Sequence, residues 1–103
     1  MSTKSTYAWI VTRSHWEAED MDEVGPRNAS AALVQALRAG KGRAFRMYDD
    51  DGELYYSGRA ITSDGEYDWD NEMGNPLYDY GAPAAGATRY VERIGSKWED
   101  IIG

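Results

Sequence analysis

Apolar and polar residues alternate most regularly in residues 43–61, on either side of an Asp-Asp-Asp-Gly tetrapeptide. Before it, Phe45 and Met47 share one face of an extended chain and Arg46 and Tyr48 share the other. After it, Leu54, Tyr56 and Ala60 share one face, and Tyr55, Ser57 and Arg59 share the other. Because Gly52 tolerates a positive φ, Asp-Gly between two such runs predicts a β-hairpin that turns at residues 50–52.

The residues before this hairpin predict a strand, a loop and a helix. Residues 7–13 are rich in β-branched and aromatic side chains, which favours a strand. Residues 15–24 carry five acids with little periodicity, which predicts a solvated loop. Within residues 28–40, the spacing of Leu33, Ala36 and Leu37 predicts an amphipathic helix, with Asn28 or Ser30 as its N-cap and Gly40 at its end.

Beyond the hairpin, prolines and glycines in residues 76–87 predict a turn-rich loop, residues 88–94 a last strand, and residues 95–103 a short closing turn. We therefore expect one α+β domain over residues 1–103: an antiparallel sheet of about four strands with one helix on one face, in the order β-α-β-β-(long loop)-β. The expected core consists of Trp9, Val11, Leu33, Leu37, Phe45, Met47, Leu54, Tyr56, Tyr90 and Ile94.

The composition removes several classes of site. The chain has no cysteine, so it forms no disulfide and no thiolate metal site. No apolar run is long enough for a transmembrane helix, and the polar start lacks the apolar core of a signal peptide. We expect a cytoplasmic protein that does not contact membranes.

The net charge of −7 is unevenly distributed. Residues 47–88 contain ten acidic residues and one basic residue, Arg59, whereas the parts before and after are nearly balanced. Phosphates would be repelled by this middle part, so nucleic acid is not expected as a direct partner. A basic protein surface is the expected partner.

One stretch of the middle part has acids at every second position. If it is extended, five carboxylates lie on one face and two aromatic side chains on the other; they are Asp64, Glu66, Asp68, Asp70 and Glu72, with Tyr67 and Trp69. A row of this kind imitates the charge pattern of a phosphate backbone. The predicted partner-binding surface is this row together with Asp49, Asp50 and Asp51 at the hairpin turn. Crowding is expected to raise the pKa values of such carboxyl groups.

No catalytic, cofactor or metal site is predicted. His15 is the single histidine, and no carboxylate pair is set apart by an apolar surrounding. Counted from Asp49, Gly52 is fourth and Ala60 twelfth, whereas a calcium-binding EF-hand loop needs glycine sixth and glutamate twelfth. The pattern leaves open whether the acidic turn binds a divalent ion weakly.

Three segments resemble a group of small acidic proteins of actinobacteria and their bacteriophages: residues 25–27 (GPR), 45–59 (FRMYDDDGELYYSGR) and 76–92 (PLYDYGAPAAGATRYVE). This group has an acidic pair and an Asn-x-Gly-Cys-Thr run where this chain has Tyr78-Asp79 and Ala84 to Thr88, so no thiol role carries over. The resemblance implies a bacterial or phage cytoplasm and no particular activity.

These observations lead to a primary hypothesis and two alternatives. The primary hypothesis is a non-enzymatic binding module, phage-related, that presents its carboxylate row to a basic protein and acts as an inhibitor. The first alternative is a small structural or accessory domain, and the second is a small-molecule or carbohydrate binder that uses the Tyr/Trp-rich loops. A monomer or weak homodimer is compatible with each.

Overall fold

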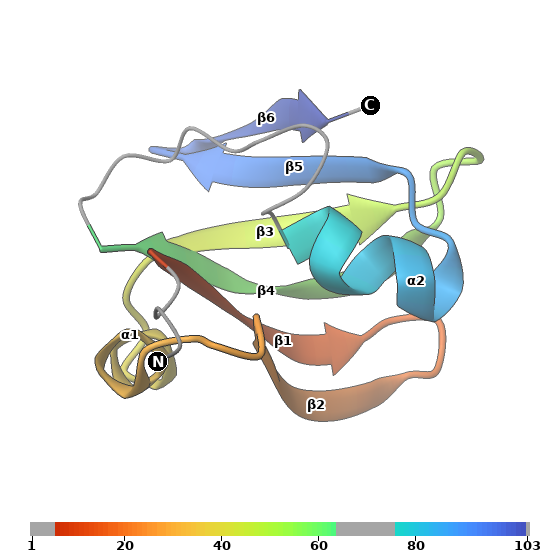
Figure 1. Ribbon diagram of the computed structural model, residues 1–103. Coiled ribbons are helices and arrows are strands. Elements are labelled where there is room, and N and C mark those ends of the chain that lie inside the picture. The colour runs from red at the N-terminus through yellow and green to blue at the C-terminus, as the bar shows by residue number, and fades with distance from the viewer. Residues whose placement is uncertain (1–5, 64–75, 103) are drawn as a thin grey trace.

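The computed structural model describes residues 6–63 and 76–102, which form a single antiparallel sheet with short helical segments on both faces (Figure 1). The strands are β1 (Tyr7–Ser14), β2 (Glu19–Gly25), β3 (Arg43–Tyr48), β4 (Leu54–Thr62), β5 (Arg89–Ile94) and β6 (Lys97–Ile102). Their order across the sheet is β2-β1-β4-β3-β5-β6. The helical segments are α1 (Ala31–Arg38), the π-helical turn η1 (Leu77–Gly81) and α2 (Ala82–Ala85).

The prediction of four strands and one helix is wrong. The described residues contain six strands in one sheet and two short α-helices. The predicted strands at residues 7–13 and 88–94 correspond to β1 and β5, and the predicted hairpin corresponds to β3 and β4. Two further strands, β2 and β6, form the edges of the sheet.

Strand β2 occupies most of the segment that was predicted to be a loop. Among the described strands it pairs only with β1 (Figure 1), and its acidic side chains are exposed. An edge strand buries little side-chain surface, so its sequence need not alternate, and its charges oppose pairing with another chain. The many acids of residues 17–23 are therefore compatible with a strand.

Strand β6 replaces the predicted closing turn. Ile94 pairs with Lys97, so the two-residue turn Gly95-Ser96 joins β5 and β6 as a hairpin. Glycine followed by serine is a known signal for such turns. The pairing brings Trp98 of β6 opposite Arg93 of β5.

The first face of the sheet carries the larger core. Its buried members are Trp9, Val11, Phe45, Met47, Tyr56, Ala60, Leu77, Ala87 and Tyr90. Segment η1–α2 covers this face (Figure 1), where the sequence predicted an irregular loop. Gly81 permits the close contact, because a Cβ atom there would lie 2.5 Å from the Met47 sulfur.

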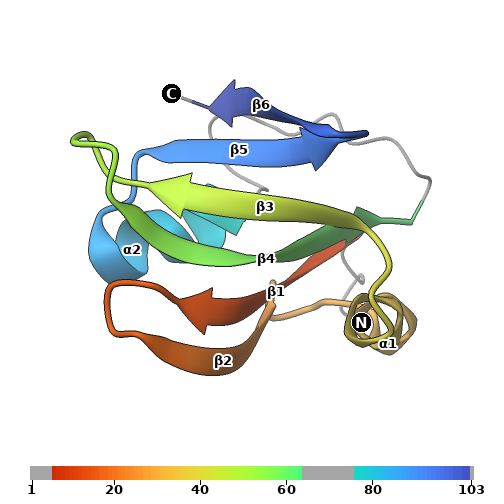
Figure 2. The ribbon, with the colours of Figure 1, turned by 180° about the vertical axis from the view of Figure 1, so that it is seen from behind.

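Among the described residues, the second face is covered only at one end. Leu37 of α1 packs there against Ala8 and Ile10 of β1, and Figure 2 shows β3 and β4 uncovered beyond the helix. The predicted helix is confirmed over residues 31–38; Ser30 is its N-cap residue, although its side chain makes no capping hydrogen bond. The structure therefore has one closed face and one largely open face.

Seven of the ten predicted core residues are buried. Leu33 and Leu54 are only partly buried, and Ile94 is 41% exposed. Ile94 lies at the end of β5 beside the Gly95-Ser96 turn, where little packs over it.

Within the described residues, no helix has the length and apolar character to cross a membrane.

Candidate functional site

Most of the predicted binding surface cannot be compared with the structure. The row of alternating acids and its aromatic residues lie outside the described residues: Asp64, Glu66, Tyr67, Asp68, Trp69, Asp70 and Glu72. The remaining three predicted residues, Asp49, Asp50 and Asp51, lie in the described hairpin turn between β3 and β4.

Two of these three aspartates have structural roles in the turn. Asp49 Oδ1 accepts hydrogen bonds from the backbone N–H groups of Asp51 (2.9 Å) and Glu53 (2.8 Å). Asp50 Oδ1 accepts one from the Thr88 hydroxyl at 2.6 Å, which ties the turn to the start of β5. The side chain of Asp51 is exposed. Gly52 has φ +84°, as the predicted turn requires.

The pKa of Asp49 differs from the expectation for crowded carboxyl groups. The hydrogen bond from the Glu53 backbone N–H, with smaller contributions from Tyr55 and other backbone N–H groups, lowers the pKa of Asp49 below its usual value. A carboxylate that accepts several N–H bonds is stabilised in its charged form more than neighbouring charges destabilise it. At this position the expected increase in pKa is therefore wrong.

The hairpin turn and the turn between β1 and β2 lie at the same end of the sheet (Figure 1). The indole of Trp16, in the second turn, is 56% exposed and lies 6.1 Å from the ring of Tyr55, centroid to centroid. The backbone N–H of His15 also donates to the Tyr55 carbonyl at 2.8 Å. We call this end the acidic end; its carboxylates are Glu17, Glu19, Asp49, Asp50, Asp51 and Glu53.

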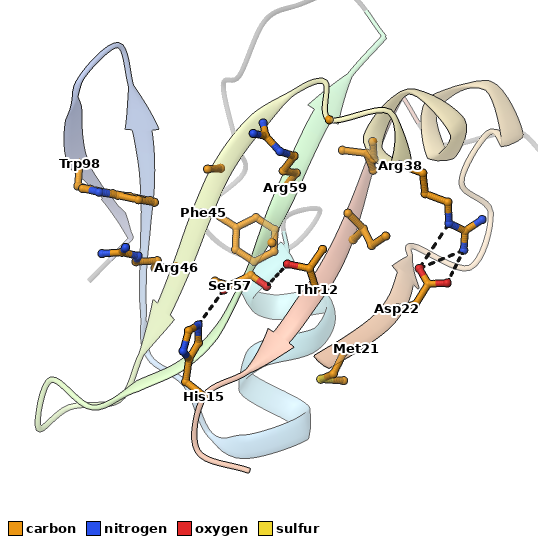
Figure 3. Close-up of a pocket in the computed structure, with 15 residues that line it drawn as sticks. Thr12, His15, Met21, Asp22, Arg38, Phe45, Arg46, Ser57, Arg59 and Trp98 are labelled. Carbon is orange, nitrogen blue, oxygen red and sulfur yellow. Dashed lines mark hydrogen bonds and ion pairs between the residues drawn. The ribbon is translucent and has the colours of Figure 1, made fainter. Parts of the chain in front are cut away.

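The open face of the sheet contains a groove of about 520 Å³, shown in Figure 3. It extends from the C-terminal end of α1 across β1, β4 and β3 to Trp98 of β6. Its lining includes the apolar residues Ile10, Leu37, Ala44 and Phe45, and the polar or charged residues Thr12, His15, Asp22, Arg38, Arg46, Ser57 and Arg59. Sequence reasoning did not identify this groove as a site.

Three arginines of the groove are each held by a different contact. Arg38 Nη2 forms an ion pair with Asp22 Oδ2 at 3.1 Å. The guanidinium of Arg46 lies over the indole of Trp98, 4.2 Å from the ring centroid. Arg59 Nη1 donates to the Gly42 carbonyl at 3.1 Å. These contacts orient the cations along the groove without neutralising Arg46 or Arg59.

His15 and Ser57 form the one pair in the groove with the composition of a nucleophile and a base. His15 Nε2 lies 2.8 Å from Ser57 Oγ. Partial burial, followed by the charges of Arg13 and Arg46, lowers the pKa of His15 below its usual value. Within residues 6–63 and 76–102 no carboxylate contacts the imidazole, so the orienting acid of a Ser-His-Asp triad has no counterpart there.

Two carboxylates on the closed face hold neighbouring elements together. Asp79 Oδ2 accepts hydrogen bonds from the Tyr7 hydroxyl at 2.5 Å and from Trp9 Nε1 at 2.9 Å, which anchors η1 to β1. Glu92 is fully buried and accepts from the Tyr90 hydroxyl at 2.7 Å, with Arg43 Nη1 3.5 Å away. These contacts support the fold and leave neither carboxylate open to a ligand.

The described residues contain no group of three or more histidine, aspartate or glutamate side chains arranged to hold a metal ion. One signal in the sequence did point to the groove, because the alternation separated Arg46 from Phe45 and Met47, and separated Ser57 and Arg59 from Tyr56 and Ala60. Their pairing in the sheet agrees with this: Arg46 is opposite Ser57, and Arg59 is opposite Ala44.

No protein-family model, no curated protein and no solved structure significantly matches this chain.

Proposed function

We propose that this protein is a non-enzymatic binding module that docks a positively charged protein surface against its acidic end. The resemblance to actinobacterial and phage proteins implies a bacterial or phage cytoplasmic setting, and in that setting we propose a role as an inhibitor of a basic partner. We propose that the five carboxylates of residues 64–72 contribute to binding of the same partner.

One observation carries this proposal: two acidic turns that are distant in sequence lie at the same end of the sheet, joined by the contact between Trp16 and Tyr55. The turns belong to the strand pairs β2–β1 and β4–β3, so they are two strand spacings, about 10 Å, apart. This is about one Debye length at 0.1 M salt. A basic partner therefore senses both turns as one negative surface.

The aromatic residues give this end more than charge. Trp16 is exposed, and tryptophan and tyrosine are enriched in protein interfaces because they bury a large area with few rotatable bonds. Hydrogen bonding to Asp49 raises the pKa of the Tyr55 phenol above its ordinary value, and the same bond ties this ring to the hairpin turn. A partner surface rich in lysine and arginine complements both the carboxylates and the rings.

The test first identifies the partner and then measures the contribution of the acidic end. Affinity capture from a bacterial lysate at low salt supplies the partner, and titration of the purified partner at several salt concentrations supplies the affinities. The test variant is D51N/E53Q, since neither side chain makes a described hydrogen bond. The control variant is E23Q/E99Q, which removes two exposed charges away from this end.

We expect D51N/E53Q to weaken binding roughly five- to thirtyfold at low salt, because each exposed interfacial charge contributes on the order of 0.5–1 kcal/mol. It should also reduce the salt dependence, whereas the control variant should change affinity less than twofold. Equal losses for both variants would mean that only the net charge matters. Unchanged affinity for both would contradict the docking proposal and favour a structural or accessory domain.

A further inference from the structure

The groove on the open face is basic, although the chain as a whole is acidic. The net charge of the chain is −7, yet the groove is lined by three arginines and one histidine against one aspartate. Asp22 is already paired with Arg38. Among the residues that the structure describes, Arg46 and Arg59 form no ion pair with a carboxylate. The groove therefore complements a negatively charged surface.

A third cation, Arg93 of β5, projects from the same face. Arg46 is opposite Val91, and Arg93 follows Val91 by two residues, so the side chains of Arg46 and Arg93 are on one side of the sheet. Arg93 Nε donates to the Gly95 carbonyl at 3.3 Å, and this arginine makes no ion pair with a described residue. Since β4, β3 and β5 are neighbours, Arg59, Arg46 and Arg93 extend over two strand spacings, about 10 Å.

The contacts of these arginines hold their guanidinium groups apart. The Arg46 guanidinium lies over the indole of Trp98, 4.2 Å from the ring centroid, whereas Arg59 Nη1 donates to the Gly42 carbonyl at 3.1 Å (Figure 3). The cations therefore do not converge on one anionic group. Each still has N–H donors for a separate carboxylate, because a guanidinium has five. This arrangement suits an occupant that presents several carboxylates over a similar width.

The acidic end of the chain itself has this form. The turn between β3 and β4 projects beyond the neighbouring strand ends (Figures 1 and 2), and Asp50, Asp51 and Glu53 are exposed on it. Glu17 and Glu19 are exposed in and beside the turn between β1 and β2, which is about 10 Å away, as calculated above. The molecule therefore carries a negative projection and a positive recess of similar width.

We propose that the groove and Arg93 bind the acidic end of a second copy of this chain. One copy contributes its groove and the other its acidic end, so the contact is heterologous and leaves one further surface of each kind for the next copy. At 0.1 M salt the Debye length is about 10 Å, which screens the net repulsion between distant charges more than the attraction across the contact. The inference rests on the proposed docking by the acidic end, for which the groove is a second basic surface.

The first test uses the unaltered chain at increasing concentration, by sedimentation velocity and by NMR of the backbone amides. At 0.1 M salt we expect the weight-average mass to rise beyond that of a dimer at millimolar concentration. At 1 M salt it should return to the monomer mass, because the Debye length falls to about 3 Å. Upon dilution, the amide signals of residues 44–46, 57–59 and 93 should shift together with those of residues 49–53.

Two variants and a matched control assign the two surfaces. R46Q/R59Q alters the groove and D51N/E53Q alters the acidic end; each should weaken self-association about fivefold or more, since each removes two interfacial charges. R27Q/K97Q removes two exposed cations that do not line the groove, and should change it less than twofold.

An equimolar mixture of R46Q/R59Q and D51N/E53Q tests the head-to-tail arrangement. The unaltered acidic end of the first variant should bind the unaltered groove of the second, so dimers should form and larger oligomers should not. If R46Q/R59Q does not fold, the dilution series of the unaltered chain still decides between the outcomes.

Several results would overturn the inference: a monomer mass at every concentration, equal weakening by R27Q/K97Q, or concentration-dependent shifts confined to residues outside the two surfaces. Tighter binding of a short single-stranded oligonucleotide to the groove than of a second copy would also overturn it. Binding of oligolysine at the acidic end separates this inference from the proposed function. If that binding occurs without self-association, only the inference fails, whereas its absence contradicts the proposed function.

Discussion

The attachment of η1 to the sheet through Asp79 gives a stability prediction that the sequence alone did not suggest. Its carboxylate oxygen Oδ2 accepts hydrogen bonds from the Tyr7 hydroxyl and from the Trp9 indole N–H, at 2.5 and 2.9 Å. Trp9 is only 3% exposed, whereas Tyr7 is partly exposed. Asp79→Ala therefore leaves the indole N–H buried without this acceptor.

The expected cost follows from these two bonds. A buried donor that loses its acceptor costs about 1–3 kcal/mol, and a hydrogen bond to a charged group contributes about 1.5–3 kcal/mol. The Tyr7 hydroxyl can form a hydrogen bond with water instead, so the loss of its bond to Asp79 costs an amount at the lower end of the second range. We expect Asp79→Ala to cost about 2–5 kcal/mol, Asp79→Asn about half as much because an acceptor oxygen remains, and Tyr7→Phe about 1 kcal/mol.

The assay is urea unfolding at pH 7 followed by tryptophan fluorescence, with the double variant completing a mutant cycle between Tyr7 and Asp79. A coupling energy of about 1–2 kcal/mol is expected for this charge-assisted contact. An Asp79→Ala cost below about 0.5 kcal/mol, or a coupling energy near zero, would show that this carboxylate does not hold η1 on the sheet.

Four further predictions concern the core, two ionisable groups and the acidic row. Leu37→Ala should cost about 2–5 kcal/mol in urea unfolding because Leu37 is 2% exposed; a cost near zero would mean that α1 does not pack on the open face. Burial, with help from Asp79, raises the pKa of the Tyr7 phenol far above the unfolded value of about 10, so folding stability should fall as pH rises above about 10 and Tyr7→Phe should reduce that fall. The Asp49 pKa is lowered, so the stability from its carboxylate is present above its ordinary pKa and lost as acid protonates it; thermal melts of Asp49→Asn should show a lower Tm at pH 7 and less further loss in acid. The triple variant E66Q/D68N/D70N should stay folded and bind the captured basic partner more weakly at low salt, and unchanged binding would remove the row from the proposed interface.

The sequence correctly predicted those strands and that helix in which one face is buried and the other is exposed. In β3 and β4, the strict alternation around Asp-Gly arises because Phe45, Met47 and Tyr56 are buried on one face while Arg46 and Ser57 line the groove on the other. Helix α1 was predictable for a related reason, since Leu37 follows Leu33 by one turn on the side that meets β1.

The elements that were missed have little contrast between their faces. Strand β2 is held by backbone pairing with β1 and exposes its acids, so its composition resembles that of a loop. Strand β6 has only the Gly95-Ser96 turn as a local signal. Segment η1–α2 contains Gly81 and Pro83 and is followed by Gly86, but its fit depends on Gly81 lying against Met47, a contact between distant parts of the chain.

The groove likewise depends on contacts between distant residues, which sequence periodicity does not reveal. The polar face with Arg46, Ser57 and Arg59 was visible in the alternation, but Trp98 reaches Arg46 only because β6 pairs with β5 beside β3. The predicted acidic turn was placed correctly, whereas the structural roles of Asp49 and Asp50 depend on partners that periodicity does not indicate.

The central claim is that the two turns of the acidic end act as one docking surface for a basic partner. The most direct measurement records backbone-amide NMR spectra of the labelled protein with and without a short oligolysine peptide. The account predicts that oligolysine shifts the amide signals of residues 15–19 and 49–53 together. Shifts confined to residues outside this end, or uniform small shifts throughout the sheet, would contradict it.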